Sequence, residues 1–516
     1  MIKIFTNEQL KEIDKYTIAN EPIQAIDLIE RAAQAFVSEF LLRYNPNSHL
    51  IIFAGQGNNG ADALAIARLL IENRTFNIEI FLFNPHPGKI SPECELSRQK
   101  LLEALRDRQI SGSKNQIFNE VSGGNFFPPL LKKGNIVIDG LFGSGLNRPL
   151  QGGFAAIVKY INASEATILS IDIPSGLMGE DNSDNIPEAI IRANLTLTFG
   201  FPKLSFLLSD TGVYAGKWKT LDIGLHPTVI KNMSTPFTQT TEEDAASMIL
   251  HRPKFSHKGT FGHALLIAGS RGKLGAALLA AQACLKSGAG LLTTHIPTCG
   301  EYILQTSFPE TMLSLDHNKE YITSMPNTAP FAAVGAGPGL GQNSETATAL
   351  KAMLQAINCP LVLDADALNI IAAHSLMPRV PAYSILTPHA KEFDRLCKNE
   401  SASSYERLEK ALTFAMEHAV VLVLKGPYTA VCTPDGEVLF NSSGNSGLAT
   451  AGSGDVLTGI ILGLLTSGYQ PETAAVLGVF IHGMAGDIAT ASVSEESLIA
   501  SDIINNLGKT FKQLKI

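Results

Sequence analysis

The chain has 516 residues, of which 45% are hydrophobic and 17% charged, so it is globular in composition and long enough for two domains. A formal net charge of −8 gives no electrostatic support for a nucleic-acid partner. The cysteines form no CxxC pair, and neither a signal peptide nor a run long enough to span a membrane is evident, so we expect a cytoplasmic protein with reduced thiols and no membrane partner.

The first half of the chain predicts a doubly wound α/β domain. It opens with an amphipathic helical pattern over roughly 7–43. Short strands that are apolar on both faces then alternate with helices, as in a parallel sheet covered on both sides. These strands are expected at 49–55, 77–83, 135–140, 167–172 and 193–200.

Loops rich in glycine and acidic residues follow three of these strands: AGQGNNGADAL (54–64), IVIDGLFGSGLNRPL (136–150) and SIDIPSGL (170–177). Because ligands bind beyond the carboxyl ends of strands in such sheets, we expect the three loops to meet. The first loop could expose backbone amides to a phosphate or be a purely structural turn. Oxygen atoms of Asn59, Asp139 and Ser175 would suit a hard cation. Each acid of these loops could instead cap a helix.

A second, different α/β domain follows the polar segment 226–260, which contains three prolines and is expected to be a linker. We place the two domains at 1–230 and 231–516. The strands of the second domain are expected at 262–270, 288–297, 331–337, 360–366, 383–388 and 420–427.

The run SGNSGLATAGSG places several glycines directly before Asp455 and an apolar helix. Successive backbone amides can form an anion-binding nest there, and the helix adds the positive end of its dipole. A substrate hydroxyl that attacks phosphorus must lose its proton, and Asp455 is placed to accept it. The alternative is that Asp455 only caps a buried helix.

Two more side chains are expected on the same rim. His389, in LTPHAKEF, could contact a ligand or cap a helix. Lys425, in LKGPYTAV, could meet a nucleotide phosphate or ribose, or be a solvated lysine of a hairpin.

The order of these motifs resembles that of the bifunctional NAD(P)H-hydrate repair enzymes. The N-terminal GQGNNGAD, DGLFGSGLNRP and DIPSG are similar to the epimerase half of that family. The later SHKG–FGHALLIAGS, GPGLG, DADALN, TPHAKEF, LKG and GNSGLATAGSGDVLTGII are similar to the dehydratase half. The resemblance implies a Rossmann-like three-layer α/β domain at 1–230, followed by a ribokinase-like three-layer domain at 231–516.

The resemblance also implies a function. Hydrated NADH and NADPH, called NADHX and NADPHX, carry a hydroxyl at C6 of the reduced nicotinamide ring. The first domain would interconvert the R and S hydrates, as an isomerase. The second would dehydrate the S hydrate with ADP, as a lyase, by making the hydroxyl a phosphate leaving group that the ring nitrogen expels. The partners would be these small molecules, in a homo-oligomer.

Transferred to this sequence, the family's catalytic residues would be Asp172 and Asp455. The hydrate would contact Asn58, Asn59, Gly60, Ala61, Asp62, Gly143, Ser144, Gly145, Leu146, Asn147, Arg148, Pro149 and Asp172 in the first domain, and Gly337, Gly339, His389 and Asp455 in the second. The nucleotide, with a magnesium ion, would contact Lys425, Gly426, Pro427, Tyr428, Thr429 and Gly454. A potassium ion would bind Asn59, Asp139 and Ser175.

The first loop departs from the usual GNNGGDG of the family because Ala61 and Ala63 replace glycines. If either position needs a left-handed backbone, the epimerase would be weakened. The main alternative function is a ribokinase-class small-molecule kinase with a ligand-binding N-terminal domain. The nest and Asp455 serve that kinase equally well, whereas the N-terminal motifs favour repair. A third interpretation makes the N-terminal half a non-catalytic binding or interaction module.

Overall fold

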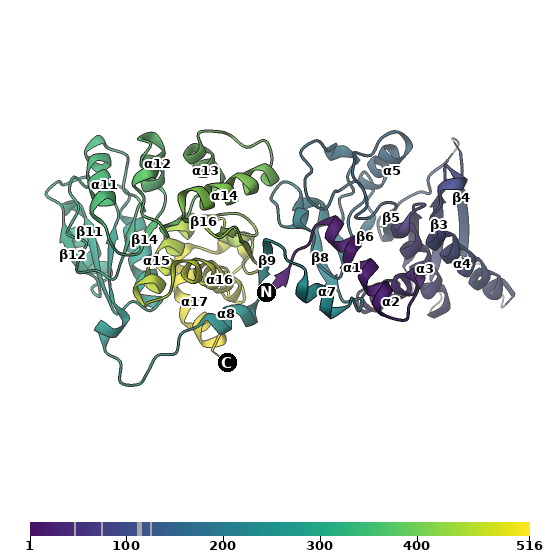
Figure 1. Cartoon of the computed structure of the whole chain (residues 1–516), viewed down its shortest axis with the longest axis horizontal. Coiled ribbons are helices and arrows are strands. Elements are labelled where there is room, and N and C mark those ends of the chain that lie inside the picture. The colour runs from purple at the N-terminus through teal and green to yellow at the C-terminus, as the bar shows by residue number, and fades with distance from the viewer. Residues whose placement is uncertain (46–47, 74–75, 111–115, 124–125, 516) are drawn as a thin grey trace. The chain divides into compact units, whose positions relative to one another are not determined.

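The computed structural model describes the chain except for residues 46–47, 74–75, 111–115, 124–125 and 516. The described chain divides into two compact units, Lys3–Thr235 and Pro236–Ile516, and the second also includes Met1–Ile2 (Figure 1). Both units are α/β, as predicted. No helix in the described ranges is long and apolar enough to cross a membrane.

The first unit is built on a seven-stranded sheet in the order β4-β3-β2-β5-β6-β7-β8, with every pair parallel. The chain winds in opposite directions from β2 and β5, so the ligand crevice is expected at their carboxyl ends. The strands are β2 (His49–Ala54), β3 (Asn77–Phe83), β4 (Gln116–Val121), β5 (Asn135–Gly140), β6 (Thr167–Ile171), β7 (Leu195–Phe199) and β8 (Lys217–Leu221). The five predicted strands are confirmed to within two residues at each end.

Two apolar cores flank this sheet because successive side chains of a strand point to opposite faces. Ile52 and Ile138 belong to the core that includes residues of α2 (Ala25–Arg43), α3 (Asn58–Asn73) and α4 (Pro92–Ile110). Phe53 and Val137 belong to the core under α5 (Gly152–Asn162). The unit therefore has the predicted three layers, and its remaining helices are α1 (Asn7–Asn20), α6 (Gly212–Ala215) and α7 (Pro227–Asn232).

The prediction of one opening helix over 7–43 is wrong. The segment forms α1 and α2, with an extended connection at 21–24. Pro22 lies in this connection, where it cannot supply the amide that a continuous helix would need.

The second unit contains an eleven-stranded sheet in the order β1-β9-β18-β17-β16-β15-β14-β13-β10-β11-β12. Neighbouring strands pair in parallel along the part of the sheet that runs β16-β15-β14-β13-β10-β11-β12. Strand β17 pairs antiparallel with both β16 and β18. The strands are β1 (Ile2–Lys3), β9 (Phe237–Thr240), β10 (His263–Ile267), β11 (Leu291–Ile296), β12 (Met312–Leu315), β13 (Ala333–Ala336), β14 (Leu361–Leu363), β15 (Ile385–Leu386), β16 (Val421–Leu424), β17 (Ala430–Cys432) and β18 (Val438–Asn441). Here the winding reverses between β10 and β13.

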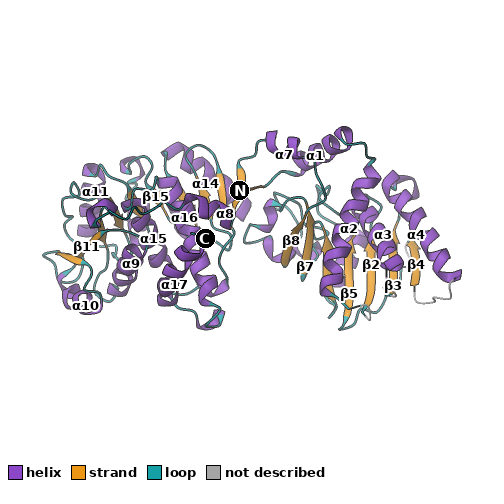
Figure 2. Cartoon of the chain, turned by 90° about the horizontal axis from the view of Figure 1, so that it is seen from below, coloured by secondary structure: helices purple, strands orange, loops and turns teal. Residues whose placement is uncertain are grey.

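Helices flank the strands of this sheet (Figure 2). Those that pack together in one layer are α8 (Glu242–Met248), α9 (Leu274–Lys286), α15 (Ser453–Thr466), α16 (Pro471–Ala489) and α17 (Ala500–Gln513). The others are α10 (Glu301–Ser307), α11 (Ser344–Ala356), α12 (Asp366–Ala373), α13 (Ala390–Cys397) and α14 (Ser404–His418). Nearly all of α15 is buried, which confirms the buried helix predicted after the glycine run.

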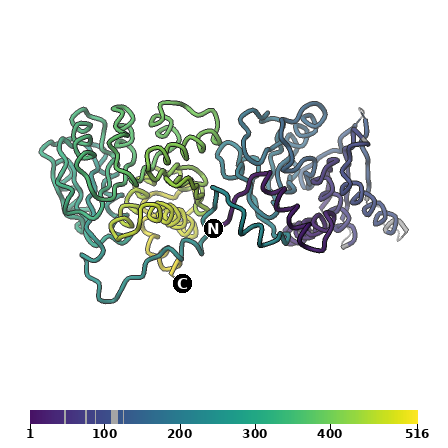
Figure 3. The backbone as a smooth tube through the Cα atoms, viewed as in Figure 1, coloured from purple at the N-terminus to yellow at the C-terminus, as the bar shows by residue number. Residues whose placement is uncertain are grey.

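The segment 226–260 is not simply a linker, in contrast to the prediction. It contains α7, β9 and α8, and β9 pairs with β18 in parallel. The longest irregular stretch of this segment lies between α8 and the turn at 258–261 (Figure 3).

Candidate active sites

A cavity of about 630 Å³ lies at the carboxyl ends of β2 and β5 in the first unit. The loops after these strands and Asp172 at the end of β6 line it together, as predicted. The expected hydrate-binding residues in its wall are Asn58, Asn59, Asp62, Gly143, Ser144, Gly145, Leu146, Asn147, Arg148 and Asp172. Gly60, Ala61 and Pro149 do not line the cavity.

The two alanines of the first loop lie within α3, where both are fully buried. Neither Ala61 nor Ala63 has a positive φ. The helical backbone therefore accepts both methyl groups without the strain that a left-handed position would impose.

Asp172 is held by a buried lysine that the sequence motifs did not single out. The Lys203 ammonium lies 2.7 Å from the carboxylate, and the Phe199 amide donates to the same oxygen at 3.1 Å. Lys203 is only 2% exposed, and such a buried lysine requires partners. Asp172 itself has a φ of +62°, a strained value typical of functional positions.

The three residues expected to bind potassium gather around the Phe142 carbonyl. The Asn59 amide donates to that carbonyl at 2.8 Å, and the Ser175 hydroxyl at 3.2 Å. The fully buried Asp139 carboxylate accepts from the Ser175 amide at 2.8 Å and from the Ser175 hydroxyl. The Asp139 carboxylate, the Ser175 hydroxyl and the Phe142 carbonyl bring together oxygen atoms of the kind that a hard cation prefers, so these groups fit potassium, whereas Asn59 presents its amide nitrogen to the Phe142 carbonyl. Asp139 holds a loop here and does not cap a helix.

Asp14, on α1, lines the same cavity although no motif pointed to it. Burial, with the nearby negative charge of Asp172, raises the pKa of Asp14 to about 6, while Lys203 acts in the opposite direction. Burial also raises the pKa of Asp62 well above its usual range, with the charges of Asp172 and Asp14 adding to the effect. The cavity thus contains a paired carboxylate and two weak acids.

In the second unit, Asp455 is the third residue of α15 and not its cap. The cap position is Gly452, which has a left-handed φ of +85° and makes no side-chain hydrogen bond. The Gly454 and Asp455 amides have no hydrogen-bond partner in the described chain, which leaves them free to bind a phosphate. The Asp455 carboxylate likewise has no hydrogen bond or ion pair with the residues described. The alternative of a simple N-cap is therefore wrong.

A partly buried ion pair lies beside this helix start. Lys425 donates to Asp364 at 2.8 Å, and the Thr458 hydroxyl donates to the other carboxylate oxygen at 2.8 Å. Lys425 is therefore not a solvated hairpin lysine, although residues 425–429 do form the turn between β16 and β17. Asp364 stands in the DADALN motif but received no role from the sequence. Burial and the charge of Asp364 raise the pKa of Asp455 to about 6, and Lys425 opposes this shift.

His389 caps α13, as one of its two interpretations predicted. Its ring Nδ1 accepts from the Glu392 amide at 3.3 Å, and Glu392 accepts from the His389 amide at 2.9 Å. The side chain is nevertheless 49% exposed, and a parallel bridge to Lys425 places it at the same rim. Capping and ligand contact are therefore compatible at this residue.

The GPGLG loop also reaches this rim. A Cβ on Gly337 would lie 1.8 Å from the Asp364 carbonyl oxygen, so only glycine allows this approach. The Ser270 hydroxyl donates to the Gly339 carbonyl at 2.7 Å, which joins the loops that follow β10 and β13. The predicted residues of the second site therefore meet at the carboxyl edge of the sheet, beside its reversal point.

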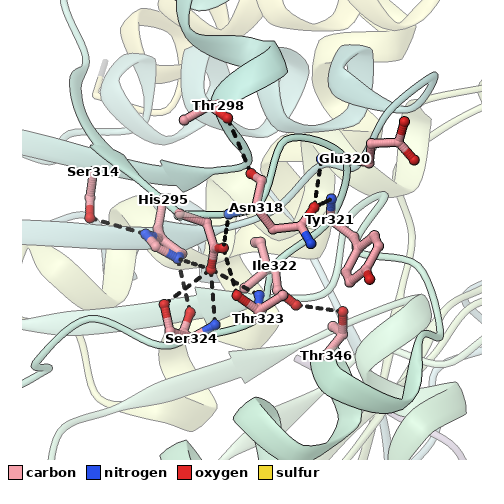
Figure 4. A network of polar contacts seen from close by, with 11 residues as sticks. His295, Thr298, Ser314, Asn318, Glu320, Tyr321, Ile322, Thr323, Ser324 and Thr346 are labelled. Atoms are coloured by element: carbon pink, nitrogen blue, oxygen red, sulfur yellow. Dashed lines mark hydrogen bonds and ion pairs between the residues drawn. The ribbon is translucent and has the colours of Figure 1, made fainter.

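A further polar network secures the strand ends next to this site (Figure 4). His295 of β11 contacts the Ser314 hydroxyl at 3.0 Å and the Ser324 carbonyl at 3.0 Å. The buried Asp316 carboxylate, just after β12, holds the loop 316–324 through Thr323 and Ser324.

Known proteins match the chain over nearly its whole length. The family model for the YjeF-related protein N-terminus matches residues 25–205, and that for NAD(P)H-hydrate dehydratase matches residues 264–508. The bifunctional NAD(P)H-hydrate repair enzyme of Moorella thermoacetica is 32% identical over 99% of this chain and 97% of its own.

Two solved structures resemble the second unit. The ADP/ATP-dependent NAD(P)H-hydrate dehydratase of Bacillus subtilis, crystallised with ATP and Mg²⁺, is 34% identical and covers 53% of this chain and 97% of its own, with a TM-score of 0.48. A ribokinase-like protein of Enterococcus faecalis is 25% identical and covers 55% and 98%, with a TM-score of 0.49.

The comparisons agree with the architecture of the two units. The predicted Rossmann-like domain followed by a ribokinase-like domain is confirmed. The match to full-length relatives has the same order of halves that the sequence motifs indicated. The chain belongs to the family of bifunctional NAD(P)H-hydrate repair enzymes.

Proposed function

We propose that this protein repairs hydrated NADH and NADPH, with residues 1–230 interconverting the R and S hydrates and residues 231–516 dehydrating the S hydrate with ADP. The observation that carries the proposal is the presence, in one chain of this family, of an acid-lined cavity around Asp172 and of a helix start with free amides at Asp455. A kinase is not favoured, because full-length relatives have the name of the repair enzyme and a kinase has no use for the first cavity.

Dehydration follows from the arrangement at α15. The Asp455 carboxylate accepts the proton of the C6 hydroxyl as this hydroxyl attacks the terminal phosphorus of ADP, and the bond from that phosphorus to the bridging oxygen breaks to release AMP. The Gly454 and Asp455 amides stabilise the charge on the transferred group. Phosphate then leaves C6 with the electrons of its C–O bond, the ring nitrogen lone pair assists, and loss of a C5 proton restores NAD(P)H.

The remaining contacts of this site follow the motifs. Gly337, Gly339 and His389 contact the hydrate, and the turn from Lys425 to Thr429 contacts the nucleotide. The nucleotide phosphates are oxygen ligands of the kind that Mg²⁺ prefers, so a magnesium ion would enter this site with the nucleotide. The related Bacillus subtilis dehydratase was crystallised with ATP and Mg²⁺.

Epimerisation takes place in the first cavity. Asp172, paired with Lys203, acts as a base, and the loops at 58–62 and 143–149 bind the hydrate. Asn59, Asp139 and Ser175 would hold a potassium ion, and its positive charge would help to order the loop that carries Asp172 and Ser175.

One assay tests the proposal. Purified protein receives an equal mixture of R and S hydrates with ADP and Mg²⁺, and the return of NAD(P)H absorbance is followed. Full recovery, faster than spontaneous epimerisation allows, is expected. Recovery of only the S half would reject an active first domain, and phosphorylation of a simple alcohol without any recovery would favour the kinase.

A further inference from the structure

Three carboxyl groups share the cavity of the first unit, yet the expected chemistry gives a catalytic role to Asp172 alone. Asp62 lies near the start of α3, and Asp14 lies midway along α1. Helix α1 precedes the region matched by the N-terminal family model, which begins at residue 25. The position of Asp14 in the cavity is therefore visible only in the folded unit.

The surroundings divide these groups into a base and two acids. Lys203 and the Phe199 amide bind Asp172 as a carboxylate. Asp14 forms no hydrogen bond or ion pair with the described residues, and its carboxyl group faces a cavity large enough for a nicotinamide ring. The charged groups that act on Asp14 are Asp172, Asp62 and Lys203, from three different elements.

We propose that Asp14 is a general acid of the epimerase site and that it acts together with Asp172, an inference that rests on the epimerase function proposed above. The proton of Asp14 passes to the C6 hydroxyl oxygen of the hydrate. The C6–O bond breaks and its electron pair leaves with the water that forms, while the nitrogen lone pair makes a double bond to C6. Water adds to C6 from the other face, and its proton passes to Asp172.

The protons and the water molecules of this reaction balance without a further reactant. One water leaves and one adds, so the product is the other epimer, and a proton has moved from Asp14 to Asp172. Proton exchange with solvent then returns Asp14 to its protonated form and Asp172 to its ionised form. In the reverse reaction Asp172 donates the proton and Asp14 accepts it. Asp14 suits the donor role because its pKa of about 6 leaves a protonated fraction near neutral pH and makes release of the proton easy.

The test is epimerisation in the absence of ADP, where the dehydratase cannot consume the S hydrate. Purified R hydrate is supplied to the full-length protein and the formation of S hydrate is followed by chromatography. Asp14→Asn is expected to lower kcat by about 10²–10⁴-fold, the usual contribution of a general acid, with KM within about threefold. Asp14→Glu should regain part of the rate. Glu12→Gln, a matched change at an exposed position of the same helix, should behave as wild type.

The outcomes separate the two claims. If the wild-type protein is no faster than the spontaneous reaction, the proposed epimerase fails. If the wild-type protein is active and Asp14→Asn keeps its kcat, or changes only KM, Asp14 is not the acid. Intact ADP-dependent dehydration and an unchanged thermal midpoint show that the variant is folded. If Asp14→Asn does not fold, the pH profile of kcat for the wild-type protein is measured instead. A fall in kcat as the pH rises above about 6 would support Asp14 as the acid, and a kcat that does not fall there would overturn the proposal.

Discussion

At the scale of the residue, the second site depends on Asp455, a carboxyl group with a raised pKa that is still mostly ionised at neutral pH. Burial and Asp364 raise the pKa of Asp455 to about 6, and Lys425 prevents a larger shift. Its carboxylate has no protein partner in the described chain, so nothing must be displaced before it accepts a proton. A base with a pKa slightly below the working pH combines ionisation with proton affinity.

Changing Asp455 to asparagine should abolish this proton transfer while leaving the backbone amides in place. We expect dehydration to fall by about 10²–10⁴-fold and the affinity for ADP to change little. In the wild-type protein, kcat/KM should decrease as the pH falls through about 6, because protonation removes the base. Steady-state kinetics and calorimetric titration with ADP measure these effects.

The control is Asp435→Asn, the same change at an exposed turn between β17 and β18 of the second unit. It should leave both quantities unchanged. If Asp455→Asn turns over at a near-normal rate, Asp455 has no part in the mechanism.

The sequence was informative for residues whose role depends on the local chain. Asp455 was predictable because its amides, glycines and helix are contiguous. Lys203, Asp14 and Asp364 were not, because each meets its partners only when distant strands or helices come together. A buried lysine and a carboxyl group in a cavity look like ordinary surface residues in a one-dimensional pattern.

At the scale of the element, loop 316–324 shows how the strand ends near the second site are secured (Figure 4). Burial would raise the pKa of Asp316, but hydrogen bonds from the amides of Asn318, Thr323 and Ser324 and from the Thr323 hydroxyl lower it to about 2. The Arg271 amide, in the loop after β10, donates to the Glu320 carbonyl at 2.7 Å, so the network reaches the neighbouring loop.

Asp316→Asn should destabilise the second unit by roughly 3 kcal/mol, because buried donors lose a charged acceptor. The folded pKa lies below the unfolded value of about 3.9, so the stabilisation is present above pH 4 and is lost as the pH falls toward 2. Denaturant unfolding at pH 7 and through this acidic range measures the difference from wild type, with Asp435→Asn as the control. Equal stabilities at pH 7 would contradict this role.

Among the strands that the sequence missed, two are polar and lie at or next to a sheet edge. In β8 (KWKTL) and β9 (FTQT), polar residues outnumber apolar ones. Such short runs have weak patterns of their own, and their place in the sheet is fixed by pairing with β7 and β18. The central strands were predictable because burial on both faces leaves a continuous apolar run.

At the scale of the whole molecule, two α/β units each place a site at the point where the strand order reverses. The first site would convert either hydrate into the other, and the second would remove only the S hydrate. Removal of S by the second site therefore drives the first reaction toward full repair. The hydrate can diffuse from one site to the other, so the two reactions require no direct transfer between the sites.

The most direct measurement separates and recombines the two activities. Asp172→Asn protein and Asp455→Asn protein are each given an equal mixture of hydrates with ADP, first alone and then together. We predict that Asp172→Asn rapidly returns only the S half as NAD(P)H, that Asp455→Asn returns none, and that the mixture returns both halves. Rapid recovery of both halves by Asp172→Asn alone, or a mixture that recovers no more than Asp172→Asn does, would contradict two sites acting in series.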